Sequence, residues 1–513
     1  MAKVDARICS SLFGLHFFDN FGFSLVVCND FYFGAARLVE SVAAIFLNAF
    51  VGDWLGRHNR LYATQTILAV NNLSIVFSCL SLVVCMFLGG QQKLVYTACL
   101  VGSVIASALS RCASEGEKLV FTKDWIVVLS KREVGSTLSN RNATITVIGH
   151  LASLVTALVA AYLIVYFGYL KATLIFVGFN LVSWAVECYL LTKLYNEVTE
   201  LHNRHDSKNN LKEINQNEKL INSTNESTNQ KSNSNRLTYM IKTYWKQPTL
   251  SAALCLVLAF MTVLGFDGIP ISYGKANGLP DDLLGIFKSI ASLISIIGAL
   301  LYTFLERRVG VRLTGLIGVI ASQVSEVYYD CIHQILNVTC VLSIYLPGSI
   351  FDLSGYISDF NFDTWSAHFV ETFSVHSPTN QLNGSFVNEA PREFLSGVDW
   401  STFTINGHPM TSILVFFTGI TLARLGVWLM DLSVMQIMQE SIAETERMTV
   451  FGVENSLCQI LAVCKDLLVI MFPDKRIFGL LIWMSVCFVF AGFLNYVWYF
   501  FKGRSNNVNK QRE

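Results

Sequence analysis

A carboxylate and three residues that weaken helices stand together inside an apolar stretch. Residues 260–274 read FMTVLGFDGIPISYG, with Asp267 among Gly265, Gly268 and Pro270. Proline removes a backbone donor and the glycines loosen the turn, so carbonyl groups near Asp267 lose their hydrogen-bond partners. A carboxylate beside freed carbonyl oxygens at membrane depth can bind a cation, and this stretch is therefore a candidate binding site.

The composition predicts an integral membrane protein. Only 14% of the 513 residues are charged and 53% are hydrophobic, whereas about a quarter of the residues of soluble domains are charged. The formal net charge is zero, which gives no basic footprint for nucleic acid. No GxxxxGK[ST] motif for ATP binding occurs, and we expect no enzymatic activity. Most of the 13 cysteines lie in apolar runs and are expected to be small buried hydrophobes.

Stretches of about 20 mostly apolar residues, long enough to cross a bilayer, recur along the chain. We expect twelve of them, at residues 8–29, 32–52, 61–88, 93–114, 140–166, 170–194, 249–272, 282–304, 311–346, 408–435, 449–472 and 476–501. The Asn/Ser/Lys-rich segment 197–247 has too few apolar residues to bury a core, so it predicts a flexible linker. It separates an N-terminal lobe (1–196) from a C-terminal lobe (248–502), each with six helices, and residues 503–513 form a tail.

The basic residues predict which side of the membrane each loop faces. Most Lys and Arg lie in the loops after spans two (GRHNR), four (KDWIVVLSKRE) and eight (ERRVGVR), in the linker and in the tail. By the positive-inside rule these loops and both termini face the cytoplasm. The polar insert 347–407 then faces outside, which suits Asn383, in an Asn-Gly-Ser sequon, as a glycosylation acceptor.

Six plus six helices with a cytoplasmic linker are typical of a major-facilitator-type transporter, whose halves rock about a midplane site. The predicted fold class is therefore an all-α membrane protein with twelve helices. Residues 52–60, GDWLGRHNR, fit the loop between spans two and three. There Gly52 would allow close helix packing, and Asp53 and Arg57 would clamp the inner helix ends in one state. The alternative is a solvated turn with a helix-end charge pair.

Seven motifs, in order along the chain, resemble the ferroportin family of iron exporters. They are GDW…NRL…QT, DWIVVLS, LSNRNATI, NLVSWAVE, QPTLSAALCLVLAFMTVLGFD, ARLGVWLMDLSVMQIMQESIAETER and FGVENSL. They cover nearly all spans and stop in the linker and the outer insert. The resemblance implies a multi-pass protein of the cell membrane that exports divalent metal, chiefly Fe(II), with Mn(II) or Co(II) as further candidates, by alternating access. We expect a monomer whose partners are the metal ion and the lipid bilayer.

In the first half, the resemblance implies a metal site built from oxygen ligands. The family's aspartate in span one matches Asp19, its span-six pair matches Asn180 and Glu187, and Asn71 replaces a Gln with another amide. Asn180 and Glu187, seven residues apart, share a helix face. Such a site suits hard cations such as Ca(II) or Mn(II) and tolerates Fe(II). No resident cofactor is expected, and coupling to Ca(II) or to protons carried by Asp19 and Glu187 stays open.

Three positions depart from the family pattern. Phe23 stands where the family has a His, and Phe493 stands where it has another. Gly268 follows LGFD, where vertebrate members have a Cys. The second-half site is left with Asp267 and freed carbonyls, without the side chains that favour a transition metal.

These departures have two consequences. His16 lies one helical turn before Asp19 and could replace the imidazole lost at Phe23; the alternative is a packing residue bonded to a neighbour. The family's Cys is where the peptide hormone hepcidin engages vertebrate members, so the Gly268 position predicts that hepcidin does not bind.

The resemblance also implies polar residues that gate the inner side. Besides Asp53 and Arg57, they are Asp124, Asn142, Arg424, Asp431, Glu446 and Arg447. Because an unpaired charge in an apolar span is costly, Arg424 and Asp431 should each have a partner that changes between inward-open and outward-open states. Static helix-end ion pairs are the alternative.

Two other functions stay open. One is a carrier of a different solute, because the lost ligands lie where selectivity is decided. The other is a receptor-like member that keeps the fold without transporting.

Overall fold

The structure is a computed structural model of the 513-residue chain. It describes residues 30–88, 93–132, 138–202, 234–266, 268–323, 336–347, 349–363, 365–366, 398–405, 408–472 and 474–510. The chain forms two compact units. Unit 1 comprises Met1–Ala253 and Leu432–Ile460, and unit 2 comprises Leu254–Asp431 and Leu461–Glu513.

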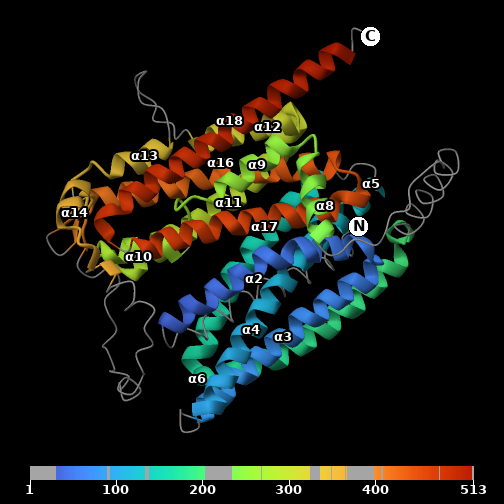
Figure 1. Cartoon of the computed structure of the whole chain (residues 1–513), viewed down its shortest axis with the longest axis horizontal. Helices are drawn as coiled ribbons and strands as arrows, with labels where there is room; N and C mark the ends of the chain where they lie inside the picture. The colour runs from blue at the N-terminus through green and yellow to red at the C-terminus, as the bar shows by residue number, and fades with distance from the viewer. Residues whose placement is uncertain are drawn as a thin grey trace. The chain divides into compact units, whose positions relative to one another are not determined.

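Helices are the regular elements of unit 1 in its described residues, and Figure 1 shows the first of them from blue to teal. Helix α4 packs against both α2 and α3, and α3 also packs against α6. The elements before Leu250 are α2 (Asp30–Arg57), α3 (Arg60–Leu88), α4 (Lys93–Leu119), the π-helical turn η1 (Val120–Trp125), α5 (Ile126–Arg132), α6 (Leu138–Glu197), η2 (Thr199–Leu201) and α8 (Ser234–Trp245). Three more helices have residues in both units: α9 (Leu250–Ala259), α16 (Thr411–Ser441) and α17 (Glu444–Met471).

Unit 2 adds more helices and a small hairpin-like sheet. Its strands are two residues long and antiparallel, in the order β1-β2-β3. They lie at the end of the insert 347–407, and the all-α prediction did not include them. The elements are α10 (Gly268–Ala276), α11 (Asp281–Val309), α12 (Val311–Gln323), α13 (Leu336–Ser343), α14 (Leu353–Asp359), β1 (Val398–Asp399), β2 (Thr404–Ile405), β3 (His408–Pro409), η3 (Lys475–Ile477) and α18 (Phe478–Lys510).

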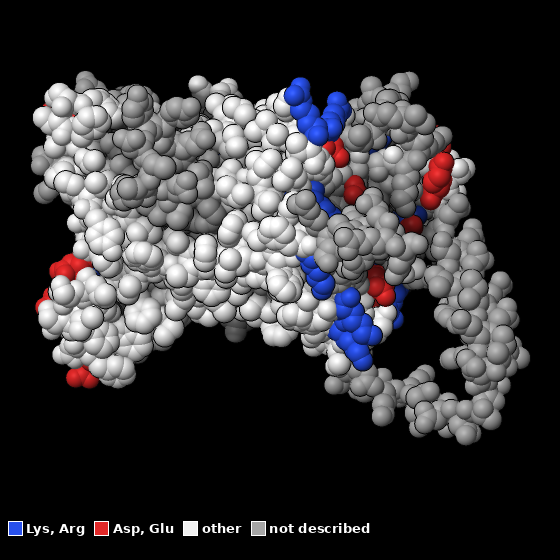
Figure 2. Space-filling view, turned by 90° about the horizontal axis from the view of Figure 1, so that it is seen from above, with Lys and Arg blue, Asp and Glu red and all other residues white. Residues whose placement is uncertain are grey.

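Seven helices in the described part of the chain are long and apolar enough to cross a membrane. They coincide with seven of the twelve predicted spans, and the chain is a multi-pass membrane protein. Side chains of α11 such as Leu293, Ile297 and Leu300 are more than half exposed, as expected where a helix faces lipid. Figure 2 shows a face on which most side chains are uncharged and the Lys and Arg side chains gather in one band.

The boundary between the predicted spans 140–166 and 170–194 is confirmed. Helix α6 consists of two helical segments that meet at Gly168, whose φ of 72° and ψ of 165° are not helical. Glycine is the residue that adopts a positive φ without steric cost. The chain therefore turns between two spans without a loop.

Two sequence-based expectations about loops differ from the structure. KDWIVVLSKRE, expected to be a loop after span four, is helical over Lys123–Arg132, in η1 and α5. The helix continues there because apolar residues such as Val127 and Leu129 are buried. In the segment 197–247, which was expected to be a flexible linker, the described residues include the helix α8, since Met240 and Tyr244 are buried.

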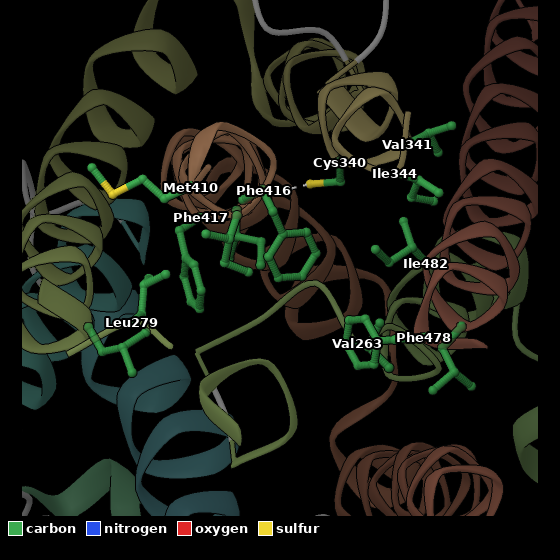
Figure 3. Close-up of a cluster of buried hydrophobic side chains, with 14 of the residues drawn as sticks. Val263, Leu279, Cys340, Val341, Ile344, Met410, Phe416, Phe417, Phe478 and Ile482 are labelled. Carbon is green, nitrogen blue, oxygen red and sulfur yellow. Dashed lines mark hydrogen bonds between the residues drawn. The ribbon is translucent and has the colours of Figure 1, made fainter. Parts of the chain in front are cut away.

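The helix break predicted near residue 265 is present. Helix α9 ends at Ala259 and α10 begins at Gly268. The amide of Val263 donates instead to Ser485 Oγ of α18 at 2.9 Å. Figure 3 shows Val263 in a cluster of buried side chains that includes Phe416 and Ile482. At the break, the Ser485 side chain thus accepts the hydrogen bond that the Val263 amide would otherwise make within a helix, and the apolar side chain of Val263 is buried.

Candidate functional site

The first-half residues of the expected metal site lie on α3 and α6, which pack together. Asn71, Asn180 and Glu187 are all buried, with at most 4% of each exposed. Asn180 Nδ2 donates to the carbonyl of Asn72 at 3.2 Å, which ties α6 to the turn of α3 that carries Asn71. Ser183 Oγ donates to Glu187 Oε1 at 3.1 Å. The structure therefore brings the two helices of this site together.

The oxygen of Asn180 is the unusual atom here. Oδ1 is buried and has no hydrogen-bond partner within the described residues. A buried acceptor without a partner costs about 1–3 kcal/mol, and a cation would satisfy it. Glu187 follows two helical turns later on the same helix.

Asn71 is already held by protein groups on both sides. Its Oδ1 accepts from Ser110 Oγ at 2.7 Å, and its Nδ2 donates to Glu117 Oε2 at 3.2 Å. Glu117, on α4, is only 2% exposed. This buried carboxylate is not predictable from the sequence, because it lies in the polar stretch SEGEK, which resembles a solvated helix end.

Several predicted metal-site and modification residues lie outside the described residues. They are Asp19, His16, Asp267 and Asn383, together with the departure at Phe23. Among the residues that the structure describes, no group of three His, Cys, Asp or Glu side chains could hold a metal ion. Of the four expected first-half ligands, the structure thus describes three: Asn71, Asn180 and Glu187.

Asp53 is the centre of a buried polar cluster. Its Oδ2 accepts from Arg236 Nε at 2.8 Å and Nη2 at 2.5 Å, and Arg57 Nε lies 3.0 Å away. Its Oδ1 accepts from Thr449 Oγ1 at 3.4 Å. The side chain of Arg57 is 49% exposed, whereas that of Arg236 is 35% exposed. The predicted Asp53–Arg57 pair exists, but Asp53 also joins α8 and α17 to α2.

Arg60 is the centre of a second cluster. Nε donates to Asp124 Oδ2 at 3.0 Å and Nη2 to Oδ1 at 3.1 Å. Arg60 also bonds Glu444 Oε1 and, through Nη1 at 3.2 Å, the carbonyl of Leu201. The side chain of Arg60 is 1% exposed. Charged groups this deeply buried need partners, and here one guanidinium joins α3, η1, η2 and α17.

A third set of contacts uses amides. Asn142 Nδ2 donates to Gln439 Oε1 at 2.7 Å, and Gln439 Nε2 donates to the carbonyl of Thr122 at 2.6 Å. Thr122 lies in the π-helical turn η1, and such turns free backbone groups for other bonds. Glu446 Oε2 accepts from Gln247 Nε2 at 2.9 Å. Within unit 1, these bonds connect α16 to α6 and η1, and α17 to Gln247, which follows α8.

Backbones of α2 and α17 touch at two glycines. A Cβ on Gly52 would lie 2.5 Å from the carbonyl oxygen of Met448 and 2.8 Å from Gly452 Cα. A Cβ on Gly452 would lie 2.9 Å from the carbonyl oxygen of Asn48. The close packing expected at Gly52 is therefore present, and its partner is Gly452.

The remaining predicted gating residues are distributed between the units. Arg447, 4% exposed, donates to the carbonyl of Ile442 at 3.3 Å in unit 1. Arg424 and Asp431 belong to unit 2. Arg424 lies beside the helix break, with its guanidinium carbon 5.9 Å from the centre of the Phe266 ring. Phe493, also in unit 2, stacks with Phe490 at 5.9 Å between ring centres, which is a packing contact.

Five residues that complete these clusters were not among the predicted site residues. They are Arg60, Arg236, Gln247, Gln439 and Glu444. Arg60 had a usable signal, since it is the last residue of GDWLGRHNR and the first of an apolar helix. Arg236 had none, because it stands in a run of Asn, Ser and Lys.

Comparisons with known proteins agree with this architecture. The family model described as Ferroportin1 (FPN1) matches residues 31–489. Ferroportin of Mus musculus is 30% identical over 92% of this chain and 85% of its own length. Ferroportin of Homo sapiens is 29% identical over 90% of this chain and 83% of its own length.

Two solved structures share the fold. One is a bacterial homologue of the iron transporter ferroportin in an outward-facing state with soaked iron, with a TM-score of 0.66 at 13% identity over 97% of this chain and 98% of that one. The other is the major facilitator superfamily proton:xylose symporter XylE, with a TM-score of 0.53 at 10% identity over 96% and 94%. The fold is therefore that of major-facilitator transporters, and since the family model covers nearly the whole chain, the chain belongs to the ferroportin family.

Proposed function

We propose that this protein exports Fe(II) from the cytosol across the cell membrane by alternating access, with Mn(II) or Co(II) as further substrates. The main support is the buried pair of Glu187 and Asn180 on one face of α6, where Asn180 Oδ1 has no hydrogen-bond partner in the described residues. The chain that carries this pair belongs to the ferroportin family. A carboxylate and an amide oxygen are ligands that a hard divalent cation accepts. Metal ions are substrates here, and Ca(II) or a proton is the candidate coupling ion.

The clusters around Asp53 and Arg60 support a gating mechanism. The Asp53 cluster connects α17 to α2, and the Arg60 cluster connects α17 to α3 and η1; both are built from hydrogen bonds between separate elements. Such hydrogen bonds and ion pairs can break together when a transporter changes state. They also hold the helices in a defined orientation, which apolar contacts alone would not do. In this proposal the clusters close the cytoplasmic side, and both chain termini lie in the cytoplasm, as the basic loops predict.

The proposal is tested by radiolabelled Fe(II) uptake into proteoliposomes that contain the purified full chain, in parallel with Mn(II), Co(II) and Ca(II). We expect Fe(II) flux that Glu187→Gln abolishes, since this change keeps the shape of the side chain and removes its charge. Thr144→Val is the control and should keep the flux, because Thr144 is exposed on α6 and bonds the carbonyl four residues earlier in its own helix. Folded protein that moves none of these metals would favour a carrier of another solute or a receptor-like member.

A further inference from the structure

Helix α8 has a buried side that fixes its orientation. Met240, Thr243 and Tyr244 are 0%, 7% and 1% exposed. Arg236 lies on the same side, since residues four apart share a helix face, and it donates to Asp53. These buried residues show which side of α8 packs on the rest of unit 1, and its other sides are exposed.

The exposed part of the α8 surface, which begins beside the buried side, carries two stripes of different chemistry. Leu237, Ile241 and Trp245 repeat every four residues and are 43%, 41% and 52% exposed. Lys242, on α8, and Lys246, the residue after its end, are also four apart and exposed, and the Lys246 amide donates to the Lys242 carbonyl at 3.2 Å, as in a continued helical turn. Residues three apart are neighbours on a helix surface, so Lys242 lies beside Trp245 and the basic stripe borders the apolar one at Trp245.

One contact and one chain connection place α8 at the level where the apolar helices of unit 1 end. Asp53, the partner of Arg236, lies in the last turns of the apolar stretch Val39–Arg57. The chain then enters the apolar helix α9 at Leu250, five residues after α8 ends at Trp245. A helix at the end of one membrane-crossing stretch and the start of another lies at the depth of the lipid headgroups.

This position explains why an exposed apolar stripe and a basic stripe stand side by side. Three large apolar side chains exposed to water would be unfavourable, and the boundary of the acyl chains removes them from water. Lysine keeps its stem beside apolar surface while its ammonium group reaches outward to the phosphates. Trp at this depth is typical of membrane interfaces.

We propose that α8 is a binding surface for anionic phospholipid. Lys242 and Lys246 bind the negatively charged headgroups, and Leu237, Ile241 and Trp245 pack on the upper part of the acyl chains. The preference is for anionic over zwitterionic lipid, because the two ammonium groups lie on one stripe and attract net negative charge. The helix is held from its other side by the Arg236–Asp53 contact.

The test measures lipid retained by the purified full chain. The protein is extracted from vesicles of phosphatidylcholine and phosphatidylserine, and mass spectrometry counts the bound molecules of each lipid. Lys242→Gln/Lys246→Gln is compared with Lys193→Gln, which removes another exposed lysine, near the end of α6. The unfolding midpoint of each variant serves as a check on folding, since all three lysines are exposed.

We expect the double variant to bind phosphatidylserine on the order of 25-fold more weakly, from about five-fold per lysine. Phosphatidylcholine binding should be unchanged, and Lys193→Gln should behave like the unaltered protein. Trp245→Ser should weaken the retention of both lipids. Unchanged phosphatidylserine retention in the double variant, or an equal loss in Lys193→Gln, would overturn the proposal. The result does not depend on whether the protein transports metal.

Discussion

The guanidinium of Arg60 binds both carboxylate oxygens of Asp124, with N–O distances of 3.0 and 3.1 Å. The two residues are 64 positions apart, and Asp124 lies in a π-helical turn. The pair is nearly inaccessible to solvent, with side-chain exposures of 1% and 3%. Glu444 of α17 joins the same guanidinium. This group of charges is therefore the strongest candidate for a contact that forms in one transport state and breaks in another.

Arg60→Met should be the most destabilising single change in this cluster. It leaves Asp124 buried without its guanidinium, and breaking a buried ion pair in this way costs about 3–5 kcal/mol. Arg57→Met is the control, because Arg57 is half exposed and the buried Asp53 keeps its bonds to Arg236 when Arg57 is lost. The unfolding midpoint in detergent measures both. Equal shifts for the two variants would mean that Arg60 is not held as described.

Gly52→Val should prevent α2 and α17 from packing. The new Cβ would lie 2.5 Å from the carbonyl oxygen of Met448 and 2.8 Å from Gly452 Cα, and backbone atoms cannot move aside as a flexible side chain can. Gly56→Ala is the control, since its Cβ would meet only side chains, the nearest at 3.4 Å. We expect transport to fall at least about ten-fold in Gly52→Val, equivalent to roughly 1.4 kcal/mol. A normal flux in this variant would show that the glycine contact is not needed in the cycle.

Much of the fold follows from hydropathy alone, because a membrane-crossing helix must be apolar over about 20 residues. The predicted span 61–88 is α3, Arg60–Leu88, almost to the residue. The span boundary at Gly168 was also predictable, since it falls between two long apolar runs. Helix α8 was not predictable in this way, because its buried residues Met240 and Tyr244 are few and the rest of the segment is polar.

The candidate site was only partly predictable, and the reason is physical. That Asn180 and Glu187 share a helix face could be predicted from their spacing of seven residues. The partners of Asp53 and Arg60 come from segments up to 396 positions away, such as Thr449, and no local pattern encodes such a pairing. Glu117 is buried only because the packing of α3 against α4 encloses it.

Ser485→Ala should destabilise the segment between α9 and α10, where the helix is broken. The change removes the acceptor at 2.9 Å from the Val263 amide, which is buried, and an unsatisfied buried donor costs about 1–3 kcal/mol. Ser289→Ala is the control, because Ser289 is exposed and bonds only the carbonyl four residues earlier in its own helix. Hydrogen exchange of amides 260–266 reports the effect locally. Protection that stays the same in Ser485→Ala would count against this role.

Hepcidin should not bind this protein. Position 268, where α10 begins, is a glycine and offers no thiol to the hormone. Binding of fluorescent hepcidin to cells that express the protein is the measurement, with Gly268→Cys as the comparison variant. Saturable binding to the unaltered protein would contradict this expectation.

We propose that the first-half site carries the metal, because the resemblance places Gly268 and Phe493 where the family has a Cys and a His. The most direct test ranks Fe(II) flux into proteoliposomes for Glu187→Gln, Asp19→Ala and Asp267→Ala. We predict that either first-half change abolishes flux while Asp267→Ala retains part of it. The reverse order, with Asp267→Ala inactive and Glu187→Gln active, would contradict the account and place the essential site in the second half.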